Sequence, residues 1–174
     1  LFVVKEFWRK YPRWVWIVMV LALISIDQST KAFFASTIPL GSAIEVTSWF
    51  NFVHVLNTGA AFSILADAGG WQRWFFIFIG VLVLLPITLL CLLRKIDPAE
   101  CWICAGVVAG GGSNLIDRIQ TGAVVDFLDV HWKALRWPAF NLADVFIVSA
   151  MFAWVGLSII MSQRPPTDLC KESL

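Results

Sequence analysis

Two aspartates occupy positions that a membrane-embedded chain tolerates poorly. Asp126 directly follows Val124 and Val125, and Asp144 lies near the start of a long apolar segment. A carboxylate at bilayer depth costs about 3 kcal/mol on insertion scales, so such groups persist mainly where they have a function. Two carboxyl groups that meet can share one proton and activate a water molecule. The pair therefore predicts aspartic-protease chemistry.

The composition is that of an integral membrane protein. Hydrophobic residues make up 59% of the 174 residues and charged residues only 14%, with a mean hydropathy of +0.79. A soluble domain has about 25% charged residues. The net charge of +1 and the absence of a run of Lys and Arg give no indication of nucleic-acid binding. Ten Trp and fourteen Phe suit interfacial belts and lipid-facing packing.

Four apolar segments are predicted to cross the membrane as helices, each close to the ~20 residues that a span requires. These segments are about 14–34, 74–93, 99–119 and 142–161. The third carries Gly106 and the run Gly110-Gly111-Gly112, and small residues allow helices to approach closely. The sequence therefore predicts an α-helical membrane protein with a single membrane-embedded domain over residues 1–174.

The distribution of Lys and Arg predicts the orientation. The N-terminal tail, the loop between the second and third spans and the C-terminal tail together hold eight of the thirteen basic residues. The positive-inside rule then places both termini in the cytoplasm. The basic start followed by an apolar segment could also be a cleaved signal peptide, but no Ala-x-Ala site follows, so a retained anchor is favoured. Residues 164–174 are expected to form a disordered tail.

Two segments, about 35–73 and 121–138, then lie outside the membrane. β-branched and aromatic residues dominate parts of both, which predicts short strands at 44–47, 50–55 and 123–130. Asp126 is on the second segment, and Asp144 follows one short loop later. Both carboxyl groups are therefore expected at the outer face, where they can meet. The first segment is expected to act as a lid over the substrate.

Polar side chains also gather at the outer helix ends, in pairs that lie on one helix face. These pairs are Asp27 with Lys31, Asn114 with Arg118, and Asn141 with Asp144, joined by Asp117 and by Asn57 and Gly59 of the first outer segment. Each pair alone has a structural explanation as an ion pair or a helix cap. Together they form a polar ring at one membrane level, which favours a functional site because such groups are costly to bury in lipid.

Other chemistries find less support in the sequence. The chain has two histidines and no His-Glu-x-x-His motif, which argues against a zinc peptidase. Ser113 lacks the Gly-x-Ser-x-Gly pattern of a serine nucleophile. The four cysteines all fall on the predicted cytoplasmic side, including the Cys101-x-x-Cys104 pair, so no structural disulfide is predicted. Neither a metal nor a cofactor is expected.

Five ordered blocks of residues resemble those of signal peptidase II, the bacterial aspartyl protease of the inner membrane that processes lipoproteins. The blocks are Asp27-Gln28-x-x-Lys31, Asn57-Thr58-Gly59-Ala60-Ala61-Phe62-Ser63, Asn114-Leu115-Ile116-Asp117-Arg118, Val124-Val125-Asp126-Phe127 and Phe140-Asn141-x-Ala143-Asp144. Each block alone is weak evidence for the family. Their order and spacing, together with the four predicted spans, make the joint match specific over nearly the whole chain.

The resemblance implies roles for individual residues. The catalytic aspartates of the family fall on Asp126 and Asp144. Substrate-binding positions are expected at Asn57, Gly59, Asn114, Arg118 and Asn141, and structural polar positions at Asp27, Lys31 and Asp117. One departure is Ser113, where the family usually has Gly. A Ser hydroxyl can bond to a carbonyl of its own helix, so a small local cost is expected.

The resemblance also implies the substrate. It would be a prolipoprotein whose lipobox Cys already carries diacylglyceryl, cleaved immediately before that Cys. A cyclic peptide such as globomycin would be an inhibitor, no cofactor would be needed, and the chain would act as a monomer in the bacterial inner membrane, with its site near the outer leaflet.

Two other classes of function remain open on the sequence. A small transporter or channel would also carry intramembrane Asp, Lys and Arg. However, the polar residues gather at one depth and do not follow a path through the bilayer. A non-catalytic assembly subunit would account for the glycines, which promote helix contacts, but not for two aspartates converging on the outer face.

Overall fold

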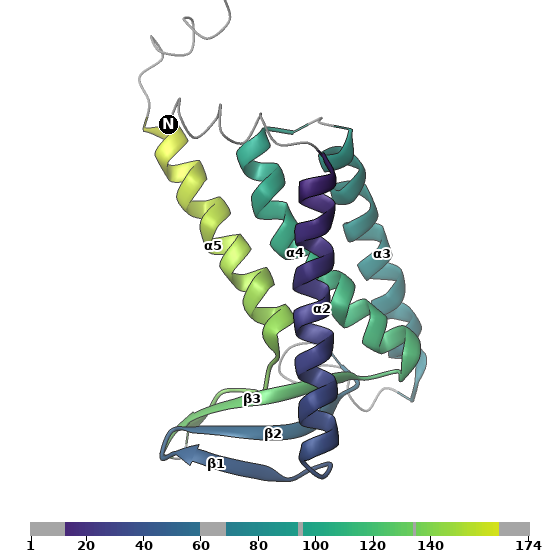
Figure 1. The fold of residues 1–174 in the computed structure, drawn as a ribbon, viewed down its shortest axis with the longest axis vertical. Helices are drawn as coiled ribbons and strands as arrows, with labels where there is room; N and C mark the ends of the chain where they lie inside the picture. Colours follow the sequence, from purple (N-terminus) through teal and green to yellow (C-terminus); the bar gives the residue numbers. More distant parts are fainter. Residues whose placement is uncertain (1–12, 60–68, 94–95, 134, 164–174) are drawn as a thin grey trace, which may run out of the picture.

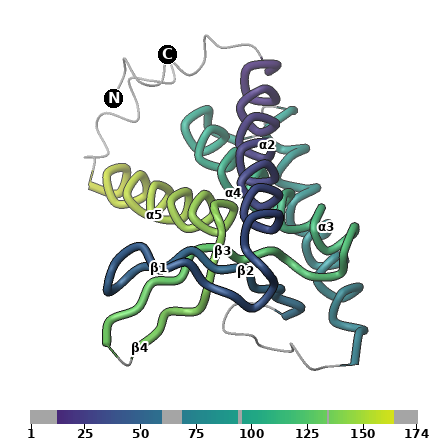
Figure 2. Tube along the Cα trace, turned by 60° about the horizontal axis from the view of Figure 1, so that its bottom comes forward, coloured from purple at the N-terminus to yellow at the C-terminus, as the bar shows by residue number. Residues whose placement is uncertain are grey.

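The computed structural model describes residues 13–59, 69–93, 96–133 and 135–163. The helices are α2 (Arg13–Thr37), α3 (Trp71–Leu92), α4 (Pro98–Gln120) and α5 (Leu142–Ser162), and the strands are β1 (Ala43–Thr47), β2 (Phe50–Asn57), β3 (Val124–Trp132) and β4 (Leu135–Arg136). The expected C-terminal tail and the second half of the Asn57 to Ser63 motif lie outside the described residues. The helices form a bundle, and the strands gather at the end of the bundle where α2 ends and α5 begins (Figures 1 and 2).

Within the described residues, three helices are long and apolar enough to cross a membrane: α2, α3 and α5. Four spans were predicted, and α4 is not among these three. It has 23 residues, but its glycines and polar side chains make it less apolar than the others. Instead α4 packs against α2, α3 and α5, so it lies at the centre of the bundle (Figure 1). Large apolar side chains are exposed along α3 and α5, as expected for surfaces that contact lipid.

Two glycines of α4 allow its close contact with α5. A Cβ atom built on Gly110 would overlap the carbonyl oxygen of Ala143 and lie 2.8 Å from Cγ1 of Ile147. On Gly106 it would lie 3.0 Å from Cβ of Ala150. The contact at Gly110 is against the first turn of α5, which carries Asp144. The small residues predicted to promote helix packing therefore set the position of this turn.

The predicted strands form one antiparallel sheet in the order β1-β2-β3-β4. β2 pairs with β3 from Phe50 opposite Val130 to Asn57 opposite Val124, with an irregularity between Phe52 and Val55. This register brings the end of β2 alongside the start of β3. Asn57 therefore lies next to the strand segment that carries Asp126.

Aromatic packing joins the end of α2 to the sheet. The ring of Phe34 stacks on Phe52 of β2 at 4.5 Å and on Phe127 of β3 at 4.7 Å between centroids. Phe127 is 1% exposed. Because Phe34 of the helix stacks on rings of both strands, this aromatic contact holds the sheet against the bundle.

The sheet is also bonded to the segment that enters α5. The amides of Phe127 and Leu128 donate to the carbonyl oxygen of Phe140, and the amide of Phe140 donates back to the carbonyl of Leu128. β3 and the start of α5 are therefore held in a fixed register. This arrangement determines how Asp126 and Asp144 lie relative to each other.

Replacing Gly110 with Ala should destabilise the fold by about 1–3 kcal/mol, because the added methyl overpacks the contact between α4 and α5. The matched control is Gly156→Ala on α5, where nothing lies within 4 Å of the added Cβ. That substitution should be neutral or stabilising by up to about 1 kcal/mol, since Ala favours helix over Gly. Thermal melts in detergent micelles measure both. Equal melting temperatures for the two variants would show that the helices do not pack as closely as described.

Candidate active site

The two aspartates expected to meet are brought together by one residue, Asn141. Its side chain is fully buried, and its Nδ2 donates to Oδ1 of Asp126 at 2.7 Å. Its backbone amide donates to Oδ2 of Asp144 at 3.2 Å, and its Oδ1 accepts from the amide of Asp144 at 3.0 Å. A single asparagine thus contacts both carboxyl groups, which lie on different elements, β3 and α5.

Local sequence explains the half of this arrangement that lies on α5. Asn141 is the N-cap residue and Asp144 is the third residue of the helix, and each side chain bonds the backbone amide of the other. This reciprocal pattern is a capping box, which satisfies amides that a helix start leaves unbonded. The same bonds fix the Asp144 carboxylate at the positive end of the helix dipole.

Each oxygen of the two carboxylates accepts one hydrogen bond. Oδ2 of Asp126 accepts from Nδ2 of Asn57 at 3.1 Å, and Oδ1 of Asp144 accepts from Nδ2 of Asn114 at 2.9 Å. With the two bonds from Asn141, four donors occupy the four oxygens. The three asparagines were predicted to bind substrate. In the structure, their side-chain amide nitrogens donate hydrogen bonds to the carboxylates of Asp126 and Asp144.

A buried lysine orients one of these asparagines. Lys31 is 3% exposed, and its Nζ lies 2.8 Å from Oδ1 of Asn114, 2.7 Å from Oδ2 of Asp27 and 2.8 Å from Oδ2 of Asp117. The ammonium therefore bonds the amide oxygen of Asn114, which leaves the amide nitrogen directed at Asp144. The predicted pair of Asp27 with Lys31 is present, and Asp117 is a second carboxylate on the same lysine.

Asp27 joins three helices. Its Oδ1 accepts from the backbone amide of Ala143 in the first turn of α5 at 2.8 Å, and its Oδ2 accepts from the hydroxyl of Ser113 on α4 at 2.7 Å. The Ser113 hydroxyl could have bonded a carbonyl of its own helix, but it donates to Asp27 instead. Gln28 donates to the Ser113 Oγ and to Oδ1 of Asp117. Ser113 and Gln28 were not predicted as members of this network, although Gln28 stands in the first block of the resemblance.

Arg118 reaches from α4 to the first outer segment. Its Nη2 donates to the carbonyl oxygen of Gly59 at 2.8 Å, and its Nη1 donates to the carbonyl of Asn114 at 3.2 Å. The guanidinium also lies over the ring of Phe76, 5.1 Å from its centroid. Asn57 Oδ1 in turn accepts from the amide of Gly59 at 3.0 Å. The predicted residues at 57, 59 and 118 are thus linked beside Asp126.

Burial changes the acidity of the carboxyl group on the sheet. Asp126 is 3% exposed, and this burial, followed by the nearby charge of Asp144, raises its pKa from 3.8 to about 7. The amides of Asn57 and Asn141 and the charge of Lys31 act in the opposite direction but do not cancel the effect. Two adjacent carboxyl groups, one of them holding its proton near neutral pH, can act as an acid and a base together.

The profile of the family described as signal peptidase (SPase) II matches residues 19–160 of the chain. The chain belongs to the signal peptidase II family. Among its relatives, the lipoprotein signal peptidase of Aeromonas hydrophila is 47% identical over 150 residues, covering 83% of this chain and 87% of the relative. The lipoprotein signal peptidase of Shewanella pealeana is 44% identical over 156 residues, covering 86% of this chain and 85% of the relative.

Solved structures show the same fold. A bacterial membrane enzyme determined at 2.3 Å resolution is 27% identical and superposes with a TM-score of 0.77, covering 90% of this chain and 95% of that one. A second, at 1.9 Å resolution, is 26% identical with a TM-score of 0.72, covering 90% of this chain and 97% of that one. The family resemblance predicted from the five blocks is therefore confirmed, and the chain is a membrane peptidase of this family.

Asn141→Ala should lower peptidase activity about 100-fold, because a small misplacement of reacting groups is enough for such a loss. It should also cost about 1 kcal/mol of stability through loss of the helix cap. The control is Asp97→Ala at the start of α4, where the side chain caps the amide of Ala99 far along the chain from the aspartates. The control should lose similar stability and keep its activity. Equal loss of activity in both variants would mean that Asn141 acts only through helix stability.

Proposed function

We propose that the chain is an aspartic endopeptidase that removes the signal peptide from diacylglyceryl-modified prolipoproteins, cutting just before the lipidated Cys. The observation that carries the proposal is the contact of Asn141 with both Asp126 and Asp144. This contact brings two carboxyl groups into one site, which is the requirement for aspartic-protease chemistry. Family membership supports the class of substrate, because the relatives are lipoprotein signal peptidases.

The proposed site lies where such a substrate would present its scissile bond. Asp144 is in the first turn of α5, and Asp126 is on the sheet at that end of the bundle (Figure 1). We place this end at the outer face of the bacterial inner membrane, with α4 as the fourth span and both termini in the cytoplasm. The acyl chains and signal peptide of the substrate are embedded in lipid, so the bond beside the lipidated Cys would lie near the same level.

In the proposed reaction, a water molecule lies between the two carboxyl groups. The ionised group removes a proton from this water, and the protonated group donates to the oxygen of the scissile carbonyl. The resulting gem-diol then collapses to release the signal peptide. We assign the proton to Asp126, whose pKa is raised to about 7 by burial, and the role of base to Asp144 at the start of α5, where the helix dipole favours an anion.

The surrounding polar residues would hold the dyad and the substrate. Because their amides already bond the carboxylates, we propose that Asn57, Asn114 and Asn141 position the aspartates. Arg118 and Gly59 lie beside the dyad and are proposed to contact the substrate backbone. The network of Asp27, Lys31 and Asp117 is proposed to be structural. All of these residues come from one chain, which supports a monomeric enzyme.

Asp126→Asn and Asp144→Asn should each remain folded and lose cleavage of a diacylglyceryl-modified prolipoprotein by about 1,000-fold or more, because each removes a group that acts on the reacting atoms. The matched control is Asp129→Asn, which alters another buried aspartate of β3 that bonds Asn51 and Arg136 away from the dyad. Cleavage is measured in detergent micelles, with thermal melts to verify folding. If either dyad variant cleaves at nearly the wild-type rate, the dyad assignment is wrong.

The same assay distinguishes this mechanism from metal-dependent hydrolysis and from transport. A chelator should leave the rate unchanged, because the proposed chemistry uses only carboxyl groups and water. Loss of cleavage in chelator that is restored by zinc would contradict the dyad. A wild-type protein that never cleaves this substrate, yet carries proton or solute flux in liposomes, would support the transporter instead.

The cleavage rate should fall as the pH rises above about 7, because the pair loses its shared proton there.

The free energy of unfolding should also fall as the pH rises toward 7. A carboxyl group whose pKa is raised from 3.8 to about 7 by folding stabilises the fold below 3.8, and that stabilisation is lost as the pH rises to 7. In the Asp126→Asn variant, the melting temperature should therefore depend less on pH over this range. A rate that rises steadily through pH 7, or an unchanged melting profile in the variant, would exclude Asp126 as the proton carrier.

A further inference from the structure

A pocket of about 550 Å³ lies on the sheet away from the two aspartates. It lies where β3 ends and β4 begins, and Val130 on its wall is four positions beyond Asp126 along β3. The residues that line the pocket are Trp49, Val130, His131, Trp132, Leu135, Arg136 and Trp137. Three tryptophans therefore surround one hollow that the peptidase chemistry does not use.

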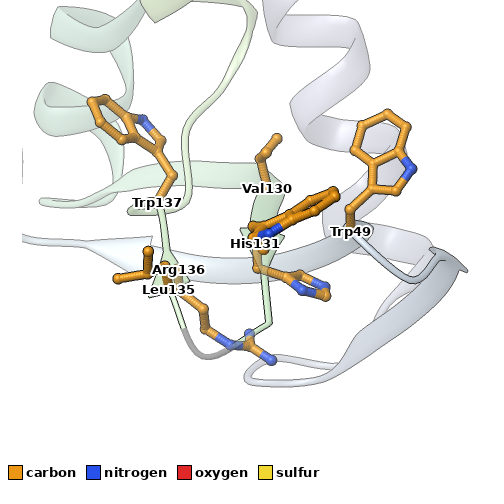
Figure 3. A pocket seen from close by; sticks show the side chains of 7 residues that line it. Trp49, Val130, His131, Leu135, Arg136 and Trp137 are labelled. Atoms are coloured by element: carbon orange, nitrogen blue, oxygen red, sulfur yellow. The ribbon is translucent and has the colours of Figure 1, made fainter.

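The two faces of the sheet differ at this pocket. Figure 3 shows the side chains of Trp49, Val130 and Trp137 directed toward the side of the sheet on which the helices lie. The imidazole of His131 and the guanidinium of Arg136 lie on the opposite side. The strand register agrees, because His131 pairs with Arg136. This end of the sheet is therefore amphipathic, with its apolar face toward the helices.

The apolar face is largely uncovered. Trp49 is 50% exposed, Trp137 is 60% exposed, and Trp132, which pairs with Leu135, is 68% exposed. Large apolar side chains that gather in one exposed patch mark a surface that contacts another hydrophobic partner. Within the described part of the chain, no helix covers this patch as α2 covers the sheet at Phe34.

The position of the patch points to the membrane as that partner. Trp137 precedes the first residue of α5, Leu142, by five positions, so it lies within about 18 Å of the point where an apolar helix begins. Phe140, between them, is bonded to β3, which holds this segment against the sheet. Indole rings concentrate at the boundary between lipid headgroups and acyl chains, because each ring has an apolar body and one polar N–H.

We propose that the face formed by Trp49, Trp132, Leu135 and Trp137 binds the outer leaflet of the bilayer, with its indoles at the headgroup level. Phospholipid fills the side of the pocket toward which Trp49, Val130 and Trp137 are directed. The apolar face continues the lipid-contacting surface of α5 onto the sheet, whereas His131 and Arg136 on the other face remain in water. The sheet is then held at a fixed height on the membrane, independently of the chemistry of the two aspartates.

Depth can be measured on the native tryptophans. The protein is labelled with 5-fluorotryptophan and placed in phosphatidylcholine nanodiscs, and the ¹⁹F signals are assigned with Trp49→Phe, Trp132→Phe and Trp137→Phe. Two probes are compared: a lipid with a nitroxide on its headgroup and a water-soluble gadolinium chelate. All three signals should be broadened severalfold more by the lipid probe than by the chelate. Trp154, exposed on α5, is the control, and its signal should be broadened by a third probe, a lipid with a nitroxide deep in its acyl chain.

Two results would overturn the proposal. Broadening of the three signals by the chelate and not by the lipid probe would place this face in water. Signals that respond to neither probe would show that protein covers it, and dilution of the protein in the nanodiscs would then identify a second copy as the cover. Neither result depends on whether the chain cleaves prolipoproteins, so this test and the test of the aspartates can fail separately.

Discussion

The buried ammonium of Lys31 is the interaction on which the rest of the structure depends. It lies between the carboxylates of Asp27 and Asp117, and all three groups are nearly inaccessible to solvent. Removing one partner from such a group leaves an uncompensated buried charge, at a cost of about 3–5 kcal/mol. The Asp27 carboxylate also accepts a hydrogen bond from the backbone amide of Ala143. The position of the first turn of α5, and with it Asp144, therefore follows from where this lysine holds α2 and α4.

The same network explains the acidity of the dyad. Lys31 and Arg118 face four carboxyl groups, those of Asp27, Asp117, Asp126 and Asp144, so two cations minus four anions would give a charge of −2 if all were ionised. Lys31 is in contact with the carboxylates of Asp27 and Asp117, and Arg118 donates to backbone carbonyl oxygens. Within the described part of the chain, the carboxyl groups of Asp126 and Asp144 have amide donors but no cation in direct contact. One retained proton reduces the net negative charge from −2 to −1, which agrees with the raised pKa of Asp126.

Sequence reasoning succeeded where the signal is local. Apolar segment length predicted the helices, and the spacing of Asp27 and Lys31 predicted an ion pair, which is present at 2.7 Å. It failed where a contact joins distant segments. The contacts that no local pattern indicates are Lys31 with Asp117, Asp27 with Ala143, Asn57 with Asp126, and Asn114 with Asp144. Asn114 and Arg118, predicted to lie on one helix face, are bonded to each other, but through the backbone carbonyl of Asn114. Helix ends carry polar residues for several reasons, and only the packing selects among them.

Asp126 lies on a sheet and Asp144 on a helix that is apolar enough to span the membrane, and the proposed hydrolysis would explain this division. Peptide hydrolysis needs water and charged groups, which the hydrocarbon core excludes. Recognition of a lipid-embedded substrate needs a helix surface in contact with lipid. A site at the junction satisfies both, provided that the sheet cannot move relative to the helix. The bonds from Phe127 and Leu128 to Phe140, and from Asn141 to Asp126, supply that constraint, because they fasten β3 to the residues that directly precede α5.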